Sequence, residues 1–104
     1  MKRIERHKLK ENEFAESVAR MNHSPWVSAA ETYIDGRYAE AADLYRTLSV
    51  ADEAWARLRA ARSLLEAGAR ADADVQLQKA LAFFRSVGAT RSISEGEALL
   101  AATA

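Results

Sequence analysis

Two stretches of this chain carry the same pattern of small and large apolar residues, 32 positions apart. Each has a glycine, an alanine five residues later and a large apolar residue four further on, at Gly36, Ala41 and Tyr45 and again at Gly68, Ala73 and Leu77. Glycine adopts the left-handed backbone that ends a helix. The alanine lets two helices approach closely, and the larger side chain fills the space one turn later. Because one helix pair cannot bury its apolar face alone, such units are expected to stack.

The remaining signals divide the chain into helices. Alanine occurs 23 times in 104 residues and proline once, and β-branched residues are too few for a sheet protein. Ser24 and Pro25 form a helix start, with the serine as N-cap, and Asp52 is a second N-cap candidate. With the glycines and the helical spacing of apolar residues, these signals predict helices at about 25–35, 38–49, 53–67, 71–87 and 91–103.

We therefore expect an all-α fold in which short loops make neighbouring helices antiparallel. Residues 24–104 form the predicted repeat domain. Residues 1–23 differ, because the first ten carry five basic side chains against one acidic, a sum of +4. They are predicted to form a basic arm followed by a short helix at about 11–21, where Phe14, Val18 and Met21 have helical spacing.

The pattern resembles the tetratricopeptide repeat, a helix–turn–helix unit of about 34 residues. Gly36 matches the glycine of the inter-helix turn, and Tyr38, Ala41 and Tyr45 match the second helix of a unit. The following unit matches in the same way, at Gly68, Ala73, Leu77 and Ala80. The family's closing proline is missing and the spacing is two residues short. The resemblance implies two degenerate units with a C-terminal capping helix, and a non-catalytic function in protein–protein interaction.

A second resemblance covers residues 80–100. This stretch is similar to the C-terminal tail of large bacterial multidomain regulators, which carry an ATPase and often a nucleotide cyclase. It implies a regulatory tail of a bacterial signalling protein. The phosphate-binding pattern GxxxxGK[ST] is absent from this sequence, so the resemblance does not carry ATPase activity to this chain.

The resemblance also predicts a binding surface, because the first helix of each tetratricopeptide unit lines the concave face. The partner-binding residues would then be Trp26, Tyr33, Trp55, Arg59, Arg62 and Glu66. Aromatic residues and arginine dominate binding hot spots, and an arginine pair could hold a carboxylate. The alternative is that both tryptophans belong to the core and that the arginines, with Arg57, form a solvated face or contact an acidic partner outside any groove.

Enzymatic chemistry is not expected, because no convergent catalytic group can be identified. His7 and His23 are the only imidazoles and cysteine is absent, so neither a metal nor another cofactor is predicted. A small-molecule substrate is likewise not predicted. The longest apolar runs have five residues, too short for a membrane span, and a cytoplasmic location is the default.

The expected partner is a protein or peptide. Two degenerate repeats leave uncovered ends, so the helix at 11–21 is predicted to pack back over the array, or two chains to form a homodimer. The alternative function is a small helical nucleic-acid-binding protein that uses the basic arm. Equal numbers of basic and acidic side chains, 15 each, argue against it.

Overall fold

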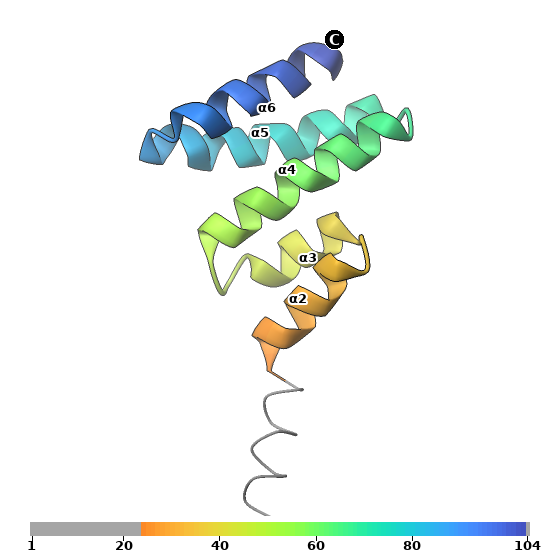
Figure 1. Cartoon of the computed structure of the whole chain (residues 1–104), viewed down its shortest axis with the longest axis vertical. Coiled ribbons are helices and arrows are strands. Elements are labelled where there is room, and N and C mark those ends of the chain that lie inside the picture. Colours follow the sequence, from red (N-terminus) through yellow and green to blue (C-terminus); the bar gives the residue numbers. More distant parts are fainter. Residues whose placement is uncertain (1–23, 104) are drawn as a thin grey trace, which may run out of the picture.

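The computed structural model describes residues 24–103, which form a stack of helices (Figure 1). Each helix packs on the next one along the chain, from α2 at one end to α6 at the other, and α4 also contacts α6. This part of the chain contains no strand, as the composition predicted. The five helices are α2 (Pro25–Ile34), α3 (Tyr38–Tyr45), α4 (Val50–Glu66), α5 (Arg70–Val87) and α6 (Thr90–Thr103).

Serine side chains start two of these helices. The Ser24 hydroxyl accepts a hydrogen bond from the Val27 backbone N–H at 3.2 Å, as predicted. The prediction for α4 was wrong, because Ser49 and not Asp52 is its N-cap: the Ser49 hydroxyl accepts from the Asp52 N–H at 3.2 Å. The helix therefore begins three residues earlier than expected, and α3 ends at Tyr45 instead of residue 49. An extended serine before a helical run is a favourable N-cap, and it competes with continuation of α3.

The glycines at the three predicted turns have positive φ angles of 81°, 80° and 66°, at Gly36, Gly68 and Gly88. After Gly36, the Arg37 N–H donates to the Thr32 carbonyl at 3.1 Å, and after Gly68, the Ala69 N–H donates to the Leu64 carbonyl at 2.8 Å. These are the hydrogen bonds of a Schellman motif. The residues directly after the two glycines also have matching backbone angles: φ is −89° and ψ 67° at Arg37, and φ is −87° and ψ 68° at Ala69. The two turns, 32 residues apart, thus have the same conformation.

Replacing Gly68 by alanine is expected to lower the free energy of unfolding by about 1–2 kcal/mol. No heavy atom lies within 4 Å of the added Cβ, so the loss would come from the left-handed backbone alone. Urea denaturation followed by circular dichroism measures it. Gly68→Asn should lose less, because asparagine tolerates this conformation. Equal losses for the two variants would contradict the backbone explanation.

The core is asymmetric along the stack. Between α4, α5 and α6 it contains large side chains that are almost fully buried, among them Leu58, Leu77, Leu81 and Phe84. The α2–α3 end has only small ones: the buried residues of these two helices are Ala29, Thr32, Ala41 and Ala42. Alanines at 56 and 60 continue this set on α4. Ala41 and Ala73, the small residues of the two predicted units, are both fully buried.

The last helix approaches α5 closely through a glycine. A Cβ on Gly96 would lie 2.6 Å from Leu81 Cδ2, and Leu81 is fully buried. Gly96 and Ser92 are the buried residues of α6, whereas Ile93, Leu99 and Leu100 are only partly buried against the core. The large apolar residues of this helix therefore lie beside the line of closest contact.

Candidate functional site

The residues predicted to bind a partner lie on one face of α4 and on the neighbouring α2. On α4, positions 55, 59, 62 and 66 recur at helical spacing, so their side chains share one side of the helix. Two adjacent hollows lie along this side. We call the first the aromatic hollow, which is lined by Tyr33, Tyr45, Asp52 and Trp55. The second, the arginine hollow, is lined by Tyr38, Arg59, Arg62, Ser63 and Glu66.

Five of the six predicted residues line these hollows, and the sixth, Trp26, lies beside them. The Trp26 ring packs edge-on against Tyr45, with centroids 6.3 Å apart, and the Trp55 ring packs against the buried Phe84 at 5.3 Å. The two tryptophans are nevertheless 49% and 47% exposed. Each indole thus has one side held by an aromatic neighbour and a large apolar area open to a partner.

The arginine hollow differs from the expected arginine pair. Arg62 forms an ion pair with Glu95 of α6 at 2.5 Å, which joins α4 to α6. The Arg59 guanidinium lies over the Tyr38 ring, 5.7 Å from its centroid, in cation–π range. Within residues 24–103 no ion pair holds Arg59, whereas Arg62 is paired with Glu95.

The aromatic hollow contains a tyrosine with altered acidity. Burial raises the pKa of the Tyr45 hydroxyl, and the Asp52 carboxylate and Tyr33 add to the increase. Its hydroxyl therefore stays protonated at neutral pH and can donate a hydrogen bond. Asp52 lies close enough to oppose formation of a phenolate.

No protein family, curated protein or solved structure matches this chain. The candidate site is accordingly defined by its own residues.

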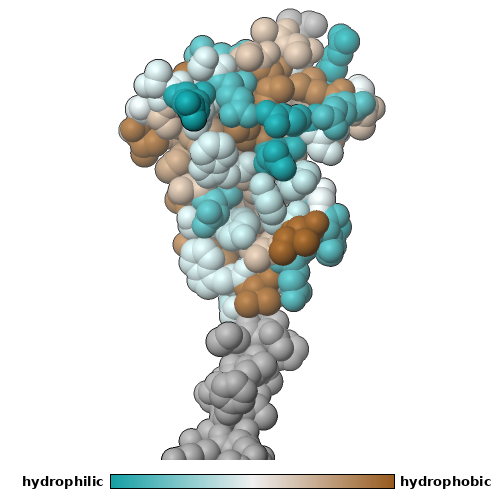
Figure 2. Space-filling model, in the orientation of Figure 1, coloured by the Kyte–Doolittle hydropathy of each residue, from teal (hydrophilic) through white to brown (hydrophobic). Residues whose placement is uncertain are grey.

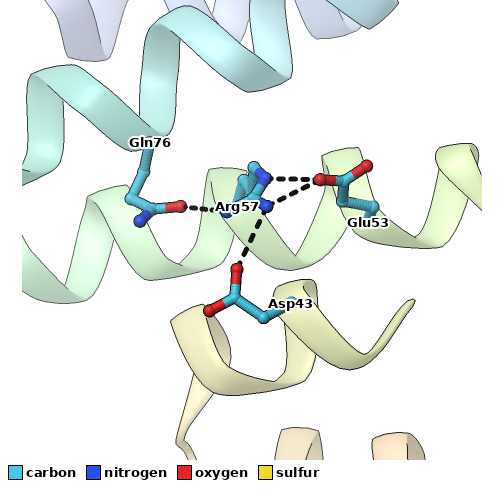
Figure 3. A network of polar contacts seen from close by, with 4 residues as sticks. All are labelled: Asp43, Glu53, Arg57 and Gln76. Carbon is cyan, nitrogen blue, oxygen red and sulfur yellow. Dashed lines mark hydrogen bonds and ion pairs between the residues drawn. The ribbon is translucent and has the colours of Figure 1, made fainter. Parts of the chain in front are cut away.

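The most deeply buried charged side chain of residues 24–103 was not predicted to be buried. Arg57 of α4 is 2% exposed, and its guanidinium connects three helices (Figure 3). It donates to Glu53 on its own helix at 2.9 and 2.6 Å, to Gln76 of α5 at 2.9 Å and to Asp43 of α3 at 3.3 Å. The Glu53–Arg57 spacing of four was visible in the sequence. The partners from α3 and α5 depend on the packing of the helices. We interpret this network as structural.

No group of three or more histidine, cysteine, aspartate or glutamate side chains in residues 24–103 is arranged to hold a metal ion. None of the described helices is long and apolar enough to cross a bilayer. On the face drawn in Figure 2, pale and hydrophilic residues separate several of the hydrophobic areas. The basic arm, the predicted helix at 11–21 and both histidines lie outside the described residues.

Proposed function

We propose that this protein is a non-catalytic interaction module that binds a segment of a protein or peptide across the aromatic and arginine hollows. One observation carries the proposal: two half-exposed tryptophans and Arg59, which has no ion-pair partner among residues 24–103, each pack against a buried or partly buried aromatic ring. Tryptophan, tyrosine and arginine are the residue types that contribute most binding energy at interfaces. Because aromatic contacts already position the rings, little rotamer freedom is left to lose on binding.

The tetratricopeptide-like arrangement belongs to the same proposal. It is supported by the equal conformation of the turns at Gly36 and Gly68 and by the burial of Ala41 and Ala73. In this arrangement α2–α3 and α4–α5 are two antiparallel units and α6 is the cap. The first helices of the units, α2 and α4, then carry the predicted binding residues. A homodimer and a role as a regulatory tail remain predictions, and the nucleic-acid alternative depends on residues outside 24–103.

The test is selection of a random peptide library on the full chain. We expect peptides that bind the wild type and that lose at least about ten-fold in affinity with Arg59→Ala. Helicity should be retained, because the Arg59 side chain is exposed and has no ion-pair partner among residues 24–103. Isothermal titration calorimetry measures the affinity and circular dichroism the helix content.

Lys79→Ala is the matched control, since Lys79 lies near Glu53 and Arg57 on the opposite side of α4. It removes one positive charge without touching either hollow. Peptides that bind Arg59→Ala as tightly as the wild type would refute the proposed surface. Failure to select any binding peptide would refute the proposed function.

A further inference from the structure

The aromatic hollow combines aromatic rings with a carboxylate. Three of its four lining residues are aromatic, Tyr33, Tyr45 and Trp55, and the faces of such rings carry the negative part of their quadrupole. The fourth lining residue, Asp52, adds a full negative charge. This combination of aromatic faces and one carboxylate is complementary to a cation.

The backbone of Asp52 is fixed at the start of α4, whereas its carboxylate has no ion-pair partner among residues 24–103. Its backbone N–H donates to the Ser49 hydroxyl in the first turn of α4. Asp52 lines the hollow together with Tyr45 and Trp55, on the aromatic side of the helix. A cation in the hollow would therefore meet a carboxylate that has no competing partner in the described structure.

The hollow has the size of one side chain. Its volume is about 190 Å³, below the range of roughly 300–1,000 Å³ that is usual for sites of small organic ligands. We infer that the aromatic hollow binds one basic side chain of the partner, a lysine or an arginine, with its cation between the rings and Asp52. This inference rests on the proposed function, because it states which side chain the bound segment places there.

Other occupants fit less well. An anion would be repelled by Asp52 and by the ring faces. A neutral apolar side chain would desolvate the carboxylate without replacing its hydration. The nearest arginine of the face, Arg59, is seven residues along α4 from Asp52, about 10 Å by helix rise. Its guanidinium lies over the Tyr38 ring and is not part of the lining of the aromatic hollow.

The experiment titrates the isotope-labelled full chain with Nα-acetyl-lysine methylamide and its arginine counterpart, observed by NMR. The neutral comparison is Nα-acetyl-norleucine methylamide, which has the same four-carbon stem without the ammonium group. We expect the basic amides to shift the Trp55 indole signal and the backbone signals of Tyr33 and Tyr45 in a saturable way. The norleucine amide should leave these signals unchanged. The basic amide with the lower dissociation constant, from the concentration dependence of the shifts, identifies the preferred side chain.

Two variants locate the binding. Asp52→Asn should weaken lysine-amide binding roughly three- to ten-fold, because it removes the charge and keeps the shape. Asp72→Asn, the same change in the first turn of α5, is the matched control and should have no effect. Trp55→Leu retains an apolar side chain but no aromatic face, and should also weaken binding. It provides a second test if Asp52→Asn disturbs the start of α4.

Three results would overturn the inference: no shift with either basic amide, equal shifts with norleucine amide, or unchanged affinity in both Asp52→Asn and Trp55→Leu. These outcomes are separate from failure of the proposed function. Peptides that require Arg59 but have no basic residue at the aromatic hollow would support the interaction surface. They would refute the inference that the hollow binds a basic side chain. Amide binding without any selected peptide would support the site for a basic side chain and refute the proposed peptide-binding function.

Discussion

Replacing Phe84 by alanine is expected to lower the free energy of unfolding by about 3–5 kcal/mol, the usual loss for a buried aromatic residue. Phe84 is 1% exposed and belongs to the core shared by α4 and α5. It also packs edge-on against Trp55 and Phe83, at centroid distances of 5.3 and 5.9 Å. Equilibrium urea denaturation measures the loss. A domain of this size has only about 5–15 kcal/mol in total, so the variant should be close to unfolding.

The control is Val87→Ala on the same helix, where the side chain is 59% exposed. An exposed substitution of this kind should change stability by less than about 0.5 kcal/mol. The Phe84 variant should also weaken peptide binding, because Trp55 loses the ring that supports it. A loss below about 1 kcal/mol for Phe84→Ala would contradict the packing described here.

Replacing Arg57 by alanine is expected to cost about 3 kcal/mol. The change removes the side chain that joins α3, α4 and α5, and it leaves Glu53 and Gln76 without their donor. Because Asp43 is largely exposed and can regain water, the loss should lie at the lower end of the range for broken buried pairs. Thermal or urea unfolding of the full chain measures it.

Arg85→Ala is the matched comparison, since Arg85 forms an ion pair with Glu97 in which both side chains are about half exposed. That pair should contribute at most about 1 kcal/mol. Arg57→Met separates charge from volume, because methionine fills part of the space without donating. If Arg57→Ala and Arg85→Ala lost the same free energy, the network at Arg57 would have no special role in joining the helices.

Local signals in the sequence were sufficient to predict most helix positions. Gly36, Gly68 and Gly88 end helices because only glycine adopts positive φ without strain. The serine cap at Ser24 was predicted for a similar local reason. The start of α4 was not predicted, because Ser49 and Asp52 are both good N-caps. Which of them serves as the N-cap depends on where α3 ends.

The candidate site was harder to predict, because exposure is a property of the packed chain. The spacing on α4 correctly places Trp55 and Arg59 on one face, but whether Trp55 is covered depends on α2 and α5. Arg62 was expected to be available, and its partner Glu95 is 33 residues away. For Arg57 the sequence suggested only contact with an acidic partner outside any groove, whereas its side chain is buried. Its partners come from three different helices.

The alanines at the α2–α3 end have a consequence for molecular recognition. A methyl group has no rotamers, so a contact built from Ala29, Ala41 and Ala42 cannot adjust by side-chain rearrangement. Because α2 and α4 both pack on α3, the placement of α2 relative to α4 depends on these methyl groups. Tyr33 of α2 and Trp55 of α4 line the same hollow, so its width depends on that placement. Residues that never touch a partner thus determine how thick a side chain the protein can accept.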